Sequence, residues 1–152
     1  MDNSGAGGAG GADSALVIPE PFTFIRSDAD LYAAWQGLMG DGGFAQSTLW
    51  LVFIDDQDRM QPLVMPIEPL PPEPDGRFVA NLTRIVGDLH DTGELASVAV
   101  LLSRPGPPEM AAADRRWARA LRDGLAGLSP WPVHLATRDR LVVFAPDDLI
   151  AA

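Results

Sequence analysis

Two side-chain types are missing from this chain of 152 residues: it contains no cysteine and no lysine, so its eleven cationic side chains are all arginines. The lack of cysteine excludes disulfides, thiolate metal sites and cysteine nucleophiles. The lack of lysine excludes Schiff-base chemistry and the phosphate-binding lysine of P-loop enzymes. A metal site would therefore have to use aspartate, glutamate or one of only two histidines.

Positive charge is also scarce, because 21 acidic residues leave a formal net charge of −10. We expect no binding to nucleic acid or to anionic membranes, since both need a surplus of cations on the binding face. No apolar run approaches the roughly 18 residues that span a bilayer, and the N-terminus lacks the features of a secretory signal. These absences predict a cytoplasmic protein.

The composition, with 47% hydrophobic and 21% charged residues, is typical of a globular domain. Residues 1–15 are rich in glycine and alanine and are predicted to form a flexible tail. Residues 16–152 are predicted to form a single domain.

Periodicity in the first half predicts a helix that starts at Ser27 or Asp28 and ends at the glycines 40, 42 and 43. The run "STLWLVFID" (47–55) predicts a strand buried on both faces. "MQPLVMPIE" (60–68) returns as a second strand, and its prolines 62 and 66 favour the edge of the sheet.

The second half alternates helices and strands. A helix is predicted from about 77 to 90, with an inward stripe of Phe78, Leu82, Ile85 and Leu89. An apolar strand in 94–103 is followed by a helix from about 111 to 128, with Trp117, Leu121 and Leu125 inward, and by a closing hairpin in 131–146. We therefore predict an α/β fold in which a mixed sheet is flanked by helices.

Three segments together resemble the RadC branch of the JAB/MPN (JAMM) domains, over roughly residues 47–150: "LWLVFIDDQDRM", "LLSRPGPPEMAAADRRWARAL" and "PVHLATRDRLVVF". The first is similar to the family's first hairpin, the second to its metal-binding loop and helix, and the third to its closing strand. The resemblance implies the JAB/MPN, or cytidine-deaminase-like, architecture.

Residue by residue, the resemblance fails at the family's zinc site. The two zinc-binding histidines correspond to Leu102 and Arg104, the serine of the motif to Ala111, and the general-base glutamate to a position near Ser47. The aspartate ligand corresponds to Asp114, the one position that keeps its family identity.

A catalytic zinc site needs about three protein ligands and an open position for water. Leu102 cannot ligate a metal, and Arg104 places a fixed positive charge where the cation would sit. We expect Arg104 to pair with Asp114, and no metal to be bound. The resemblance then implies a non-catalytic domain without a cofactor, acting as a protein-interaction or scaffold module whose partner is another protein or a second copy of itself.

Two alternatives remain at this point. The first is a metal-dependent peptidase or isopeptidase with relocated ligands, drawn from Asp114, His134 and either Glu68 or Glu109. The second is an anion-binding or small-ligand-binding domain in which Arg104 grips the anion.

The remaining candidates favour structural roles. His90 is expected to stabilise the C-terminal end of a helix, and His134 to be a buried sheet residue. "DDQDR" (55–59) lacks the glycine and glutamate of a calcium loop and is predicted to be a hairpin turn. Arg115, Arg119 and Arg122 share one helix face, which is either a solvated surface or a contact for an acidic partner.

Overall fold

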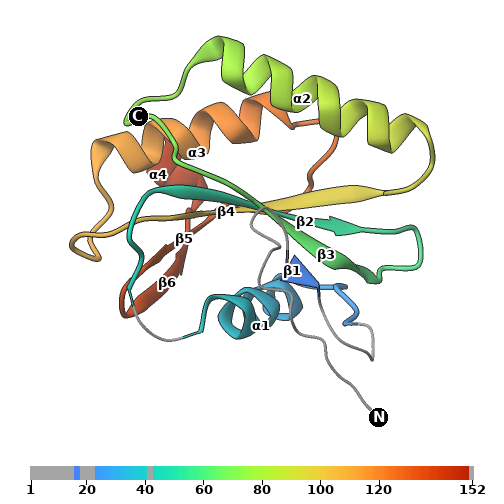
Figure 1. Ribbon diagram of the computed structural model, residues 1–152, viewed down its shortest axis with the longest axis horizontal. Helices are drawn as coiled ribbons and strands as arrows, with labels where there is room; N and C mark the ends of the chain where they lie inside the picture. Colours follow the sequence, from blue (N-terminus) through green and yellow to red (C-terminus); the bar gives the residue numbers. More distant parts are fainter. Residues whose placement is uncertain (1–15, 18–22, 41–42, 151–152) are drawn as a thin grey trace.

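The computed structural model describes residues 16–17, 23–40 and 43–150, which form a six-stranded mixed sheet with helices on both faces (Figure 1). The strand order is β1-β3-β2-β4-β5-β6. The strands are β1 (Leu16–Val17), β2 (Thr48–Ile54), β3 (Met60–Ile67), β4 (Ser97–Ser103), β5 (His134–Thr137) and β6 (Arg140–Val143). The α/β class with a mixed sheet and flanking helices is therefore confirmed. The predicted tail, 1–15, lies outside the described residues.

Four helices occur in the described part of the chain: α1 (Asp28–Met39), α2 (Gly76–Asp91), α3 (Ala112–Gly124) and α4 (Pro146–Ile150). The side chain of Ser27 caps α1 by accepting a hydrogen bond of 3.1 Å from the backbone N–H of Asp30. The helix ends at Gly40, whose φ of 63° suits a residue without a Cβ atom. The short-range signals of the sequence therefore set both ends of α1, as predicted.

Three strands of the sheet run in the same direction and end on the same side. β2 runs antiparallel to both β3 and β4, and β4 runs parallel to β5 through the crossover helix α3. The C-terminal ends of β3, β4 and β5 consequently lie at the same end of the sheet, where α/β proteins usually hold their ligands.

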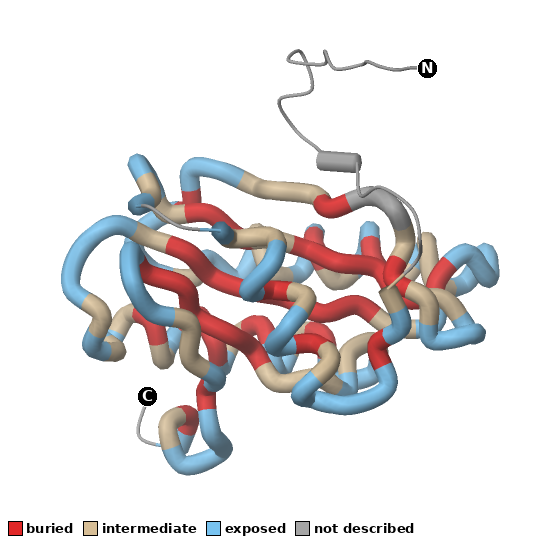
Figure 2. Tube along the Cα trace, turned by 90° about the horizontal axis from the view of Figure 1, so that it is seen from below, coloured by how far each residue is buried: buried red, intermediate tan, exposed pale blue. Residues whose placement is uncertain are grey.

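The sheet separates two hydrophobic cores because successive side chains of a strand point to opposite faces. On the α2 and α3 side, Leu49, Leu51 and Phe53 of β2 pack in one cluster. On the α1 side, Val52 and Ile54 pack with Trp35 in the other. Figure 2 shows the result, with the central strands buried along their length. This explains why the apolar run in β2 is nearly continuous.

The predicted inward stripe of α2 is wrong at one position. Ile85 is 51% exposed, whereas Val86 is 1% exposed and lies in the core. The hydroxyl of Thr83 donates a hydrogen bond of 3.0 Å to the carbonyl of Gly124 in α3. Contact with α3 as well as with the sheet turns the helix, so that the stripe passes through position 86.

Two other expectations need correction, and one helix was not predicted. β3 does not lie at the edge, because the two-residue β1 pairs with it at Leu16↔Val64. α3 ends at Gly124 rather than near 128, although Leu125 is buried beyond its end. The short helix α4 had no signal strong enough to be predicted, and it buries Leu149 against the α2 and α3 core.

No helix within the described ranges combines the length and apolar character needed to cross a membrane.

Candidate functional site

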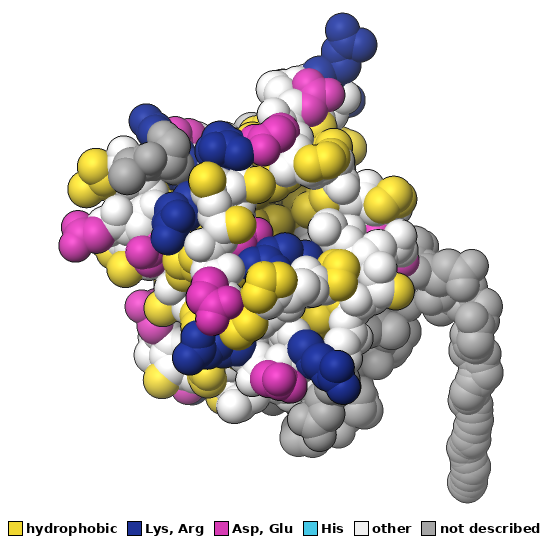
Figure 3. All heavy atoms as spheres, turned by 90° about the vertical axis from the view of Figure 1, so that its left-hand side faces the viewer, with side chains coloured by type: hydrophobic (Ala, Val, Ile, Leu, Met, Phe, Trp, Pro, Cys, Tyr) yellow, Lys and Arg dark blue, Asp and Glu magenta, His cyan; other side chains and the backbone are white. Residues whose placement is uncertain are grey.

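The five positions singled out by the resemblance lie together around one cavity of about 230 Å³, at the end of the sheet where β4 passes into α3. The lining residues are Ser47, Leu70, Pro71, Pro72, Leu102, Ser103, Arg104, Ala111, Ala113, Asp114 and Trp117. Figure 3 looks onto this side of the molecule, where hydrophobic side chains are surrounded by arginines and carboxylates. These residues come from three separate parts of the chain, and only the fold brings them together.

Strand register and helix capping position these side chains. Thr48 of β2 is paired with Ser103 of β4, so the start of one strand lies beside the end of the other and Ser47 reaches the cavity. Asp114 is the third residue of α3, and its Oδ2 accepts a hydrogen bond of 2.7 Å from the backbone N–H of Ala111. A carboxylate at this position satisfies an open N–H of the helix terminus and complements the helix dipole.

Arg104 and Asp114 form a bidentate ion pair, as predicted. The Nε atom of Arg104 donates to Oδ1 of Asp114 at 2.8 Å, and Nη2 donates to Oδ2 at 2.7 Å. The side chains are only 17% and 9% exposed. The hydrogen bond to Asp114 raises the pKa of Arg104, despite the opposing effect of burial. This is the parallel geometry in which guanidinium and carboxylate groups bind most strongly.

The rest of the guanidinium group holds the loop between β4 and α3. Nη1 donates to the carbonyls of Pro105 and Pro107 at 3.1 and 2.8 Å, and Nη2 donates to the carbonyl of Glu109 at 2.9 Å. An arginine side chain has five N–H donors, and these bonds together with the two to Asp114 use all five. Arg104 therefore has no N–H left for an external anion, which weighs against the anion-binding alternative at this position.

The residues around this cavity do not fit a zinc ion. Leu102 and Ala111 have no donor atom, and the Arg104 guanidinium is a fixed cation inside the site. Both oxygens of Asp114 already accept hydrogen bonds. Across the described ranges, no group of three or more His, Asp or Glu residues could hold a metal ion.

The relocated ligand set proposed for a hydrolase is divided by the sheet. Ala136 of β5 packs in the α1 core, and His134, two residues earlier, lies on the same face, with its ring centroid 6.1 Å from that of Tyr32 in α1. Asp114 lies on the opposite face, in α3. Burial lowers the pKa of His134, although the backbone carbonyl of Pro132, which can accept a hydrogen bond from the imidazole, and the charge of Asp28 oppose this. The side chain of Glu68 accepts a hydrogen bond of 2.9 Å from the hydroxyl of Thr48.

The arginines of α3 are partly paired. Arg116 donates to both oxygens of Glu73, at 2.5 and 2.6 Å, which joins α3 to the loop before α2. Arg122 pairs with Asp123 at 3.0 Å. No local pattern indicates Glu73 as a partner, because 43 residues separate it from Arg116. Near the end of α2, His90 lies 3.8 Å from the carboxylate of Asp91.

The contact that closes one side of the cavity was not predicted from the sequence. The indole N–H of Trp117 donates to the carbonyl of Pro71 at 3.1 Å, and the ring of Phe78 packs edge-on against Trp117. The helical spacing of Trp117, Leu121 and Leu125 predicted that Trp117 faces inward, but no local pattern could indicate its partner in a distant proline-rich loop.

The arrangement therefore amounts to an apolar hollow closed by a buried ion pair, without the ligands of a metal centre. No protein-family model matches the chain, and no curated protein matches it. Its chemistry must be inferred from this geometry.

Proposed function

We propose that this chain is a non-catalytic protein-interaction domain that associates with a second copy of itself. The observation that carries the proposal is the saturated ion pair of Arg104 and Asp114. The groups with which the site could have activated water or a substrate are instead used to hold the loop between β4 and α3.

The charge distribution supports self-association. Residues 104–140 contain seven of the eleven arginines but only four of the 21 acidic residues. The rest of the chain is strongly acidic, so the arginine-rich face of α3 on one copy is complementary to the acidic surface of another. Arginine is well suited to such contacts because its planar group binds carboxylates in two-point geometry. Arg115, Arg119 and Arg122 are the residues expected to meet the partner.

Sedimentation velocity at rising ionic strength tests this association. We expect a dimer or larger species at low salt that dissociates at high salt, because exposed charges are screened within about 10 Å at 0.1 M salt. Replacing Arg115→Glu and Arg119→Glu together should give a monomer. Arg77→Glu together with Arg84→Glu, the same change in charge at two exposed positions of α2, is the matched control and should still associate. A monomer under all conditions would refute self-association.

The catalytic alternative is tested separately by elemental analysis of the purified protein and by peptidase and isopeptidase assays before and after chelation. We expect no stoichiometric transition metal and no activity that chelation removes. A bound metal with chelator-sensitive activity would overturn the non-catalytic proposal.

A gain-of-function variant tests the correspondence with the zinc site of JAMM domains. Leu102→His and Arg104→His together would place two imidazoles beside Asp114, which gives three ligands of suitable type. We expect this variant to bind cobalt(II) with the absorption spectrum of a tetrahedral site, and the added change Asp114→Asn to abolish that spectrum. A folded double variant without metal binding would contradict the correspondence.

A further inference from the structure

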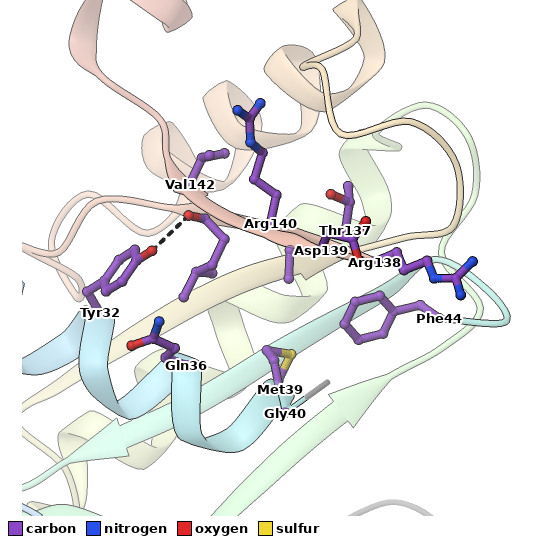
Figure 4. Close-up of a pocket in the computed structure, with 12 residues that line it drawn as sticks. Tyr32, Gln36, Met39, Gly40, Phe44, Thr137, Arg138, Asp139, Arg140 and Val142 are labelled. Atoms are coloured by element: carbon purple, nitrogen blue, oxygen red, sulfur yellow. Dashed lines mark hydrogen bonds between the residues drawn. The ribbon is translucent and has the colours of Figure 1, made fainter. Parts of the chain in front are cut away.

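A second and larger cavity, of about 660 Å³, lies on the opposite face of the sheet from the Arg104 site. It separates the last turns of α1 from the hairpin of β5 and β6, as Figure 4 shows. The lining residues are Tyr32, Gln36, Met39, Gly40, Phe44, Ala136, Thr137, Arg138, Asp139, Arg140, Leu141 and Val142. None of the five positions implied by the resemblance belongs to it.

The packing of α1 explains why this space stays open. The hydroxyl of Tyr32 donates to the carbonyl of Leu141 at 3.1 Å, which fastens α1 to β6. Next to that contact, β5 places Ala136 on the face of the sheet that α1 covers. Its small side chain leaves a hollow. α1 then ends at Gly40, and no further helical turn of the described residues covers the hairpin. The cavity is thus held open by a fixed contact on one side and a small residue beneath it.

The lining is more polar than apolar, and it combines a few apolar side chains with a charged rim. Met39, Phe44 and Leu141 are partly buried and supply apolar surface. The turn Arg138-Asp139-Arg140 is exposed and has two cations against one carboxylate. Such a surplus of positive charge is uncommon on a chain with a net charge of −10.

Arg138 is the cation best placed to bind a ligand. A Cβ atom built on Gly43 would lie 3.8 Å from Cγ of Arg138, so the arginine stem lies along the segment that carries Phe44. In Figure 4 the Arg138 side chain extends beside the Phe44 ring, whereas Arg140 points away from α1. Neither arginine has an ion pair or side-chain hydrogen bond with another described residue, in contrast to Arg104.

We propose that this cavity binds a small organic anion with a flat apolar body, whose carboxylate pairs with Arg138 while its body packs between Met39, Phe44 and Leu141. Burial of the apolar body of the ligand contributes to affinity in proportion to the apolar area removed from water. The two parallel hydrogen bonds between guanidinium and carboxylate fix the orientation of the ligand. This role is independent of self-association through α3.

The probe is 3-phenylpropionate, with phenethylamine as a cation of similar shape. In methyl-labelled protein observed by NMR, 3-phenylpropionate should shift the signals of Met39, Ala136 and Leu141, and phenethylamine should not. Arg138→Gln should weaken binding about tenfold, a loss of about 1.4 kcal/mol, because the carboxylate of the probe loses its cationic partner. Arg122→Gln, on the far side of the sheet, is the control and should leave binding unchanged.

A second variant tests the location of the site without altering any charge. Gln36 is exposed on the cavity side of α1, so Gln36→Trp should fill the mouth and block binding while the fold is retained. Equal binding of the amine, full affinity in Arg138→Gln or Gln36→Trp, or the absence of shifts at millimolar probe would each overturn the proposal. Shifts confined to Leu102 and Ala113 would place the ligand in the Arg104 cavity and refute it as well.

Discussion

Removing one member of the Arg104–Asp114 pair should cost far more stability than removing both. In Arg104→Met, the carboxylate of Asp114, 9% exposed, loses its cation, and the carbonyls of Pro105, Pro107 and Glu109 lose their donors. Breaking a buried pair from one side costs about 3–5 kcal/mol. Because the Arg104 side chain is still 17% exposed, we expect a loss near the lower limit, about 3 kcal/mol.

The double variant Arg104→Met with Asp114→Leu leaves no unpaired charge in the site. We expect it to be more stable than Arg104→Met alone, because replacing both members of a buried pair by apolar residues is often neutral. Urea denaturation of the four proteins gives the coupling free energy from the double-mutant cycle. We expect a coupling above about 1.5 kcal/mol, the range for charge-assisted hydrogen bonds.

A coupling below about 0.5 kcal/mol would be that of an ordinary surface pair and would refute the reasoning. The exposed pair of Arg116 and Glu73 provides the internal control. Its bonds are at least as short, but it is open to water, so its cycle should give the smaller coupling. If the two cycles agree, burial does not explain the strength of the Arg104 pair.

Two further predictions concern the packing on either face of the sheet. Because burial lowers the pKa of His134, the unfolded chain binds its proton first, and stability should fall as the pH drops below about 6.5 and through the folded pKa. His134→Leu should reduce this acid sensitivity in thermal unfolding scans between neutral and mildly acidic pH, and an unchanged slope would exclude His134 as its source. At the crossing of α2 and α3, a methyl group on Gly124 would lie 2.6 Å from Cγ1 of Val79, so Gly124→Ala should destabilise the fold by about 1–3 kcal/mol in urea denaturation. Gly87→Ala, with nothing within 4 Å of the added methyl, should instead stabilise by about 0.5–1 kcal/mol, and similar effects of the two changes would contradict the close packing.

The sequence predicted the elements more reliably than their neighbours. The start of α1 and the buried strand β2 depend on local signals, namely the cap at Ser27 and a continuous apolar run, and both were correct. The inward face of α2 was wrong at Ile85 because contact with α3 decides it. The position of β3 was wrong because two prolines favour an edge locally, whereas a strand pairing across 48 residues, Leu16↔Val64, determines the order.

The candidate site could be predicted in part. The pairing of Arg104 with Asp114 was expected because the resemblance places both residues at positions of zinc ligands. The use of every remaining N–H by loop carbonyls depends on the backbone path of residues 105–109, which no residue pattern encodes. The cavity beneath the hairpin left no sequence signal, since it results from a small residue, Ala136, lying opposite the end of a helix.

The sheet has a separate hydrophobic core on each face, and this arrangement determines which part of the molecule unfolds locally. α1 contributes Leu31 and Trp35 to its core, whereas α2, α3 and α4 together cover the other face. Detaching α1 would expose one side of the strands while every strand pairing and the opposite core stay intact. Amide protons in α1 should therefore exchange with solvent through a partial opening that is easier than global unfolding, whereas those of β4, sealed from both sides, should exchange last.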